Sequence, residues 1–135
     1  MSPDEINQYI GIPYKKAGND INGFDCWGFV RYIQKEYYNL ELPIISVDSS
    51  NMLSVMRNFK SNDEIANWEE QQTPSEGCAV LLTQSANPSH VGVWTNNGLL
   101  HAVKGMGVIF SSKRNLQATG WSNLKYYQHK IKEIA

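Results

Sequence analysis

A chain of 135 residues has the length of one ordinary domain, and its 41% hydrophobic residues are enough for one core. The formal net charge of -1, without a block of basic residues, argues against nucleic acid or a membrane surface as a partner. No apolar run approaches the roughly 20 residues of a membrane-spanning helix. The polar, acidic start from Ser2 to Glu5 does not look like a signal peptide, and we expect one domain over residues 1–135.

The first part of the chain carries helix signals. Ser2 and Glu5 have the spacing of a capping box, which predicts a short helix that ends before Gly11. After a loop rich in glycine and asparagine, apolar residues recur at helical spacing and end before Pro43. One further helical turn is predicted within the polar stretch 58–73. Helices are thus predicted at about 3–10, from 25 or 26 to about 41, and at 50–59.

From Pro74 onward, short apolar runs bounded by turn residues are typical of strands. Helices come first and strands second, without alternation, which favours an α+β fold with an antiparallel sheet. The five predicted strands are Cys78–Thr83, His90–Thr95, Leu99–Val103, Val108–Ser111 and Leu124–Lys130.

Cys26 is the first candidate for chemistry, because it stands in the first turn of the second predicted helix. The helix dipole and the unpaired amides there favour an anion, which lowers the pKa of a thiol. The same amides are suited to hold the oxyanion of a tetrahedral intermediate. The alternative is a structural thiol packed beneath the helix.

His90 and His101 are predicted on neighbouring strands, which suits a base and the group that orients it. Their distance depends on the turn between them. A turn at Asn96-Asn97 places His101 opposite Gly92 and diagonal to His90, within reach of the two rings. A turn at Asn97-Gly98, the stronger hairpin signal, separates the two residues by about 13 Å along the strand. Both registers remain open at this point.

Four short blocks, in this order, resemble the NlpC-type family of papain-like cell-wall peptidases. The tryptophan after the cysteine is similar to the version of the family found in phage tail proteins. The blocks are Gly11-Ile12-Pro13-Tyr14, Gly23-Phe24-Asp25-Cys26-Trp27-Gly28-Phe29-Val30, Ser89-His90-Val91-Gly92-Val93-Trp94 and Leu100-His101-Ala102.

The resemblance implies a papain-like fold, with N-terminal helices packed on a C-terminal antiparallel sheet of about five strands. It implies that Cys26 is the nucleophile, His90 the general base and His101 the orienting third member. Tyr14 matches a tyrosine that lines the site and helps to hold the oxyanion. The implied substrate is an amide in a peptidoglycan stem peptide or a similar peptide, with phage tail proteins as further suggested partners and no cofactor. The implied place of action is the cell wall, through secretion or a phage virion.

Two neighbours of the cysteine have open roles. Asp25 either tunes Cys26 or only caps the helix, where aspartate is common. Trp27 either lines a substrate groove or packs in the core. Cys26, His90 and His101 as a zinc site lack paired short ligand spacing, so no metal is predicted.

Two residues outside this set have simpler interpretations. Cys78 opens an apolar run and is expected to be buried and not disulfide-bonded to Cys26. His129, near several lysines, is interpreted as a surface residue.

Three functions are consistent with these residues. The first is a cysteine hydrolase of the NlpC type that acts through a thioester intermediate. The second is a non-catalytic phage-tail assembly or cell-wall-binding module on the same fold, and the third is a papain-like acyltransferase that excludes water. Sensitivity to thiol alkylation separates the second from the others, and product analysis separates the third.

Overall fold

The computed structural model describes residues 1–43, 67–83, 88–121 and 123–130. The predicted helix at 50–59 lies outside these residues. The helices are α1 (Pro3–Asn7), α2 (Cys26–Tyr38) and α4 (Lys113–Ala118). The strands are β1 (Asn19–Asp20), β2 (Gly23–Phe24), β3 (Trp68–Gln71), β4 (Ala79–Thr83), β5 (Pro88–Thr95), β6 (Gly98–Val103), β7 (Gly107–Ser111) and β8 (Asn123–His129).

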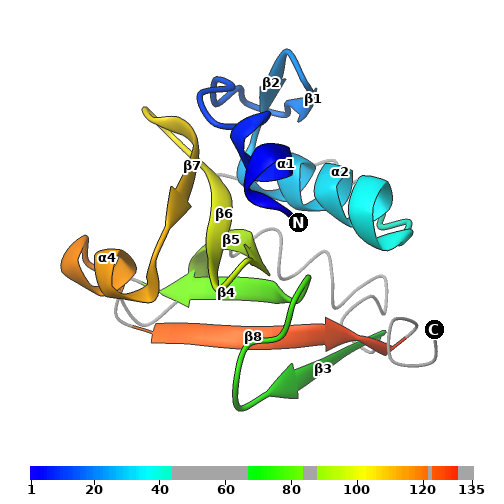
Figure 1. Cartoon of the computed structure of the whole chain (residues 1–135), viewed down its shortest axis with the longest axis vertical. Coiled ribbons are helices and arrows are strands. Elements are labelled where there is room, and N and C mark those ends of the chain that lie inside the picture. The colour runs from blue at the N-terminus through cyan, green and yellow to red at the C-terminus, as the bar shows by residue number, and fades with distance from the viewer. Residues whose placement is uncertain (44–66, 84–87, 122, 131–135) are drawn as a thin grey trace.

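The main sheet has the strand order β3-β8-β4-β5-β6-β7, and every adjacent pair is antiparallel. Figure 1 shows it as the lower and central part of the molecule, with α1, α2 and the β1–β2 hairpin above it. The predicted α+β architecture is therefore confirmed, with six strands rather than about five. All five predicted strands are present within one or two residues of their expected bounds.

Helix α2 forms where the sequence supplies a cap at each end and an apolar stripe between them. The Asp25 side chain accepts a hydrogen bond from the Gly28 amide, and Asn39 ends the helix in the left-handed conformation. Phe29, Val30 and Ile33, spaced for one helical face, are fully buried. This stripe packs α2 against β5 and β6.

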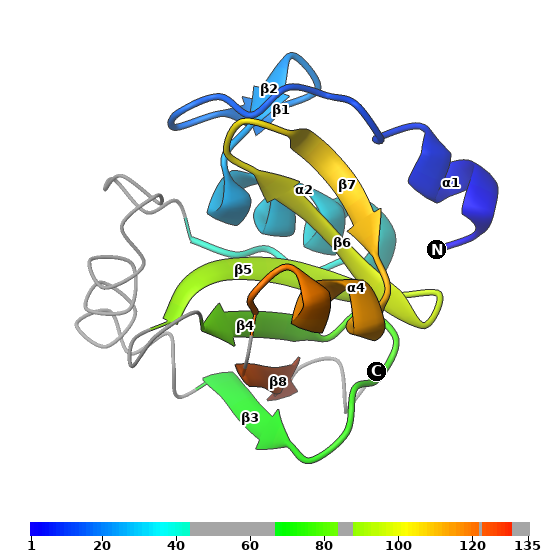
Figure 2. The same ribbon diagram turned by 90° about the vertical axis from the view of Figure 1, so that its left-hand side faces the viewer.

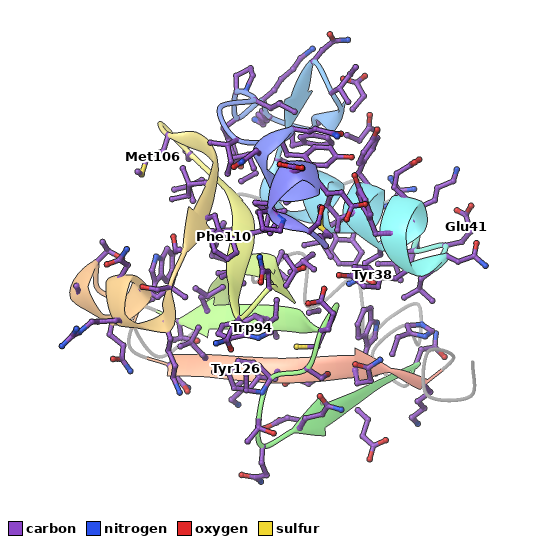
Figure 3. The ribbon with its side chains drawn as sticks, in the orientation of Figure 1. Tyr38, Glu41, Trp94, Met106, Phe110 and Tyr126 are labelled. Carbon is purple, nitrogen blue, oxygen red and sulfur yellow. The ribbon has the colours of Figure 1, made fainter. Side chains whose placement is uncertain are left out.

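Alternate residues of the strands supply two separate cores, because successive side chains point to opposite faces of a sheet. Leu81, Val91, Val93, Leu100 and Ala102 form one core with α2. The other core contains Val80, Leu82, Trp94 and Leu99 of the sheet, Tyr126 of β8 and Leu116 of α4. Figure 2 shows α2 and α4 on opposite sides of the strands, and Figure 3 labels Trp94 and Tyr126 near β4 and β8.

The two cysteines belong to different cores. Cys26 lies in the core with α2, whereas Cys78 lies with Val80 and Leu82 in the core on the α4 side. Both thiols are buried, and the described chain contains no disulfide between them. The expectation for Cys78 is therefore confirmed in its burial and in the absence of a disulfide.

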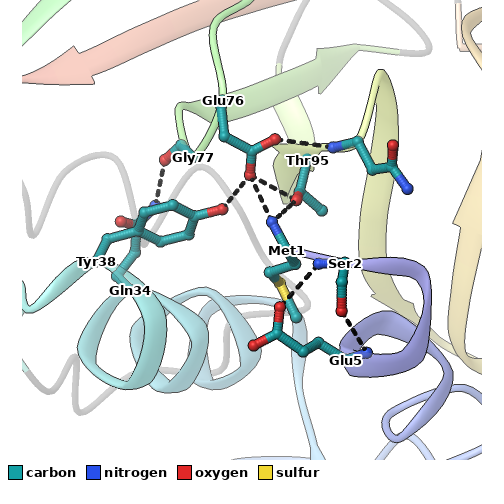
Figure 4. A network of polar contacts seen from close by, with 9 residues as sticks. Met1, Ser2, Glu5, Gln34, Tyr38, Glu76, Gly77 and Thr95 are labelled. Carbon is teal, nitrogen blue, oxygen red and sulfur yellow. Dashed lines mark hydrogen bonds and ion pairs between the residues drawn. The ribbon is translucent and has the colours of Figure 1, made fainter.

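Glu76 joins the N-terminal segment and α2 to the sheet (Figure 4). Its carboxylate accepts hydrogen bonds from the Tyr38 hydroxyl, the Thr95 hydroxyl and the Asn96 amide, and pairs with the ammonium of Met1 at 2.9 Å. These donors stabilise the charged form, and the pKa of Glu76 is lowered despite its partial burial. The network holds the C-terminal half of α2 beside the turn between β5 and β6.

Several features differ from the sequence prediction. The described part of the polar stretch 58–73 contains strand β3, not a helical turn. β3 is an edge strand that pairs with β8, and this pairing across the chain outweighs the weak strand signal of two adjacent glutamates. Helix α4 was not predicted, since its six residues are too few to show a helical period. The glycine- and asparagine-rich segment before α2, expected to be a loop, contains strand β1. Helix α1 ends at Asn7, before the expected end near residue 10.

The surface interpretation of His129 is wrong. His129 is 4% exposed and lies opposite Trp68 in the β3–β8 pair, where the two rings meet edge to face. The nearby lysines suggested a solvated stretch, but the pairing of β8 with β3 places the Trp68 ring against His129 and covers it.

Candidate active site

The start of α2 fixes the position of Cys26, which is the first residue of the helix and 2% exposed. Oδ1 of Asp25 accepts a hydrogen bond from the Gly28 amide at 2.6 Å, and the Asp25 amide donates to the Gly18 carbonyl at 3.0 Å. A Cβ on Gly28 would lie 2.0 Å from the Gly18 oxygen, so only glycine fits this close approach. Asp25 therefore has the geometry of a helix cap, and the thiol stands at the positive end of the helix dipole.

The hairpin between the two histidines has the register that brings them together. Thr95 pairs with Gly98, so Asn96 and Asn97 form the two-residue turn. Both asparagines have positive φ, at 49° and 63°, as a type I′ turn requires. The Asn97-Gly98 turn, although the stronger signal by sequence, is therefore wrong.

In this register the two imidazole rings form a buried pair. Nε2 of His90 lies 2.8 Å from Nδ1 of His101, and Nε2 of His101 lies 3.0 Å from the Ser111 hydroxyl. His90 is 6% exposed and His101 is 1% exposed. The predicted pairing of these two histidines is thus present, and a third residue, Ser111, continues the hydrogen-bonded series.

Gly92 makes room for the pair. A Cβ built on Gly92 would lie 2.9 Å from the Cβ of His101 and 2.9 Å from a methyl carbon of Leu99. We expect Gly92→Ala to push His101 away from His90 and to lower turnover at least about 10-fold, because orienting contacts of this kind act on the reacting geometry. Turnover assays and the hydrogen-bonded imidazole signals in NMR spectra would measure both effects. Gly105→Ala is a control for loss of stability alone, since its positive φ of 84° strains the backbone while its Cβ meets nothing within 4 Å. Unchanged turnover in Gly92→Ala would contradict this role.

Burial keeps both histidines neutral. It is the main cause that lowers the pKa of His90 well below its usual 6.5, and the nearby His101 lowers it further. Burial alone lowers the pKa of His101. At neutral pH both rings are therefore in the neutral form, which is the form in which an imidazole can accept a proton.

The lowered pKa values predict a loss of stability in acid. Below pH 6.5 the histidines are protonated in the unfolded chain but stay neutral in the folded protein. The unfolded state therefore binds more protons, and the free energy of unfolding falls as the pH falls. At pH 5.5 the expected cost is about 1 kcal/mol for each histidine. Urea unfolding at pH 7.5 and 5.5 measures it, and the double variant His90→Gln/His101→Gln should show a flatter dependence on pH. If the free energy of unfolding changed equally with pH in the two proteins, the lowered pKa values of His90 and His101 would be contradicted.

Trp121 is a site residue that the sequence analysis missed. Its ring stacks on His90 with centroids 5.3 Å apart and an interplanar angle of 24°. The Trp121 amide donates to the Leu116 carbonyl at the end of α4, which places the ring over the imidazole. No motif marks this tryptophan, because its position depends on a helix that was itself not predicted.

Cys26 and His90 lie on adjacent elements, since α2 packs against β5. The α2-facing positions of β5 are Val91 and Val93, so His90 leaves the strand on the side of Leu82 and Trp121. If the Cys26 thiol contacts the His90 ring, it must do so around the N-terminal end of β5, because the ring and α2 lie on opposite faces of this strand. The β4–β5 register shifts there between Leu82 and Thr83, and such irregularities re-aim side chains next to active sites. A separation within about 4 Å stays a prediction.

Tyr14 and Trp27 flank the start of α2 in different ways. Tyr14 forms an isolated parallel bridge with Phe24, two residues before Cys26, and is partly buried. Trp27 is 4% exposed, belongs to the core with α2, and donates from its indole nitrogen to the Pro43 carbonyl at 3.2 Å. Tyr14 is thus held near the helix start by the backbone, whereas the Trp27 ring has the surroundings of a core residue.

The described residues contain neither a metal-binding cluster nor a membrane-spanning helix. Within the described ranges, no three or more histidine, cysteine or acidic side chains are grouped so as to hold a metal ion. Across the same residues, none of the helices combines the length and apolar character needed to cross a membrane.

A helix that starts at a cysteine and packs on an antiparallel sheet carrying paired histidines is the arrangement of papain-like α+β domains. The sequence profile of the NlpC/P60 family matches residues 11–129. The chain belongs to the NlpC/P60 family. A crystal structure of the NlpC/p60 domain of the peptidoglycan hydrolase SagA has the same fold, with a TM-score of 0.60, 21% identity and coverage of 91% of this chain and 92% of that one.

The chain is also similar in sequence to three bacterial proteins. The murein DD-endopeptidase MepS/murein LD-carboxypeptidase of Escherichia coli (strain K12) is 29% identical over 81% of this chain and 52% of its own length. The probable endopeptidase NlpC of the same organism is 28% identical, over 84% of this chain and 67% of its own. The probable peptidoglycan endopeptidase LytE of Bacillus subtilis (strain 168) is 32% identical, over 78% and 27%. The chain therefore spans about half of MepS and about a quarter of LytE.

Proposed function

We propose that this chain is a cysteine peptidase that hydrolyses amide bonds in peptidoglycan stem peptides or similar peptides. The observation that carries the proposal is the buried His90–His101 pair, joined at 2.8 Å on a sheet against which the Cys26 helix packs. Membership of the NlpC/P60 family and relatives named as peptidoglycan endopeptidases support the same substrate class.

In the proposed mechanism, the proton of the Cys26 thiol passes to Nδ1 of His90. Nε2 of His90 is engaged with His101, so Nδ1 is the nitrogen left to accept the thiol proton of Cys26. The Cys26 sulfur then attacks the amide carbon, and the amides at the start of α2 stabilise the oxyanion. Nδ1 of His90 returns its proton to the leaving amine, which leaves a thioester on Cys26. A water molecule, deprotonated by the same nitrogen, attacks the thioester and releases the acid.

Three neighbours have supporting roles in this proposal. In this proposal His101 holds the His90 ring by accepting a hydrogen bond from Nε2–H of His90, as the third member of a triad does. Tyr14, tied to Phe24 beside the start of α2, lines the site and helps to hold the oxyanion. Asp25 keeps the first turn of α2 in place through its bond to Gly28.

The association with phage tails is a separate part of the proposal, supported by the tryptophan that follows Cys26. Trp27 is buried and donates a hydrogen bond to the Pro43 carbonyl. Its proposed role is therefore to pack beside Cys26, not to make an exposed contact with tail proteins. Co-purification of the chain with tail assemblies from a lysate of induced phage would test this part.

Digestion of purified peptidoglycan tests the proposed function. The chain should release peptide fragments with new amino and carboxyl termini, identified by mass spectrometry, and their masses would name the scissile bond. Transfer of the acyl group to an added amine in place of water would instead assign an acyltransferase. Intact peptidoglycan and intact soluble stem peptides after long incubation would contradict the proposal and favour a non-catalytic wall-binding module.

A further inference from the structure

Three polar side chains form a diagonal line across β5, β6 and β7, the last three strands at one edge of the sheet. His90 stands on β5, His101 on β6 and Ser111 at the end of β7. His101 faces Ile109 in the β6–β7 ladder, and Ser111 faces Leu99, so Ser111 lies diagonally from His101. His101 in turn lies diagonally from His90, and each diagonal step is closed by one hydrogen bond.

The three side chains of this line are buried, so the loss of any of their hydrogen bonds would leave a polar atom without a partner and away from water. The exposed fractions of His90, His101 and Ser111 are 6%, 1% and 8%. Both ring nitrogens of His101 are engaged, one with His90 and the other with the Ser111 hydroxyl. If the hydroxyl were removed, a buried ring nitrogen would have no partner, at a typical cost of about 1–3 kcal/mol.

A neutral imidazole carries one N–H, so the line has only two hydrogen-bond alignments. If the Ser111 oxygen accepts from Nε2–H of His101, then Nδ1 of His101 accepts from Nε2–H of His90. That alignment leaves a lone pair on Nδ1 of His90, ready for the thiol proton. If Ser111 donates instead, every proton shifts to the other nitrogen, and Nδ1 of His90 already carries one. Only the first alignment makes His90 a base.

We propose that Ser111 is a positioning residue of the site, whose hydroxyl oxygen holds His101 in the tautomer that keeps Nδ1 of His90 free to accept a proton. This inference rests on the proposed function, in which Nδ1 of His90 takes the proton of Cys26. Ser111 itself touches neither the thiol nor the scissile bond. Its effect reaches the reaction through His101, as does that of the third group in other hydrogen-bonded triads.

The neighbouring serine supplies a matched control. Ser112 is the N-cap of α4, and its hydroxyl accepts a hydrogen bond from the Asn115 amide at 3.1 Å. Ser112→Ala removes the same group one residue away and is expected to lower stability by loss of a cap, without a change in the tautomers of the histidines. Ser111→Thr retains a hydroxyl at the position of interest.

The experiment combines nitrogen NMR of the imidazole rings with turnover on a stem peptide. In the wild type at pH 7.5, Nε2 of His101 should carry the proton and Nδ1 of both histidines should be bare. Ser111→Ala should populate the other tautomer and lower kcat about 10-fold, the ratio that a contact of about 1.4 kcal/mol gives, with little change in KM. Ser111→Thr should restore both readouts, and Ser112→Ala should resemble the wild type.

Two results would overturn the assignment of Ser111. One is a wild-type spectrum in which Nδ1 of His101 carries the proton, a measurement that needs no variant to fold. The other is a folded Ser111→Ala protein with wild-type tautomers and wild-type kcat. Failure of the proposed function is a different result, because it is seen as absence of hydrolysis by the wild type while the tautomers remain measurable.

Discussion

Replacement of Cys26 by alanine is expected to abolish hydrolysis of stem peptides, because no other side chain at the start of α2 can form the covalent intermediate. Cys26 is small and stands at the first position of α2, where the helix is capped by Asp25. Alanine should therefore leave the fold intact. Fragment release from peptidoglycan measures the activity, and circular dichroism with thermal unfolding measures the fold.

Cys78→Ala is the matched control for Cys26→Ala. Cys78 is also buried but lies in the core on the α4 side, away from the helix start. We expect a modest loss of stability, about 1 kcal/mol for a small core truncation, and wild-type kcat. Wild-type fragment release by a folded Cys26→Ala protein would contradict a cysteine mechanism.

The second large effect separates the roles of the two histidines. His90→Ala should lower kcat by about 10²–10⁴-fold, the usual contribution of a positioned base. His101→Ala leaves the buried Nε2 of His90 without its partner and should also cause a large loss. His101→Asn can still hydrogen-bond to His90 and should retain considerably more activity than His101→Ala. Steady-state rates on one peptide substrate measure all three.

His129 provides the control for histidine replacement. It is the third histidine of the chain and is buried as the first two are, but it lies opposite Trp68 in the β3–β8 pair. His129→Asn should change stability and leave kcat near the wild-type value. Wild-type activity in His101→Ala would remove His101 from the mechanism and leave a Cys26–His90 dyad.

Local signals were sufficient to predict the elements that carry the site. The cap at Asp25 with the stripe at Phe29, Val30 and Ile33 defines α2, and short apolar runs bounded by turn residues define β4 to β8. These patterns depend on residues close in sequence. Cys26 and the two histidines were candidates from the sequence, because their residue types suit a nucleophile and its base, and the structure adds that the two histidine rings are paired.

The parts that were missed depend on pairings between distant segments. β3 is stabilised by β8, about 60 residues later in the chain, and its own sequence favours no strand. The contact of Trp121 with His90 follows from the length of α4, and that of Ser111 with His101 from the β6–β7 register. The hairpin turn shows the same limit. Asn97-Gly98 is favoured locally, yet the observed turn is at Asn96-Asn97. Both turns place Leu99 and Leu100 on the same faces of the sheet, so the apolar pattern could not decide between the two registers.

Alkylation of the native protein with iodoacetamide tests the central claim, that Cys26 is the nucleophile, most directly. Cys26 and Cys78 are almost equally buried, at 2% and 0% exposure, so access alone predicts similar, slow labelling of both. A thiol activated by the helix start and His90 should react first. We therefore expect peptide mapping to find one label, on Cys26, whose appearance parallels the loss of hydrolysis, and labelling should slow in His90→Ala. Full labelling of Cys26 with hydrolysis unchanged would contradict the account.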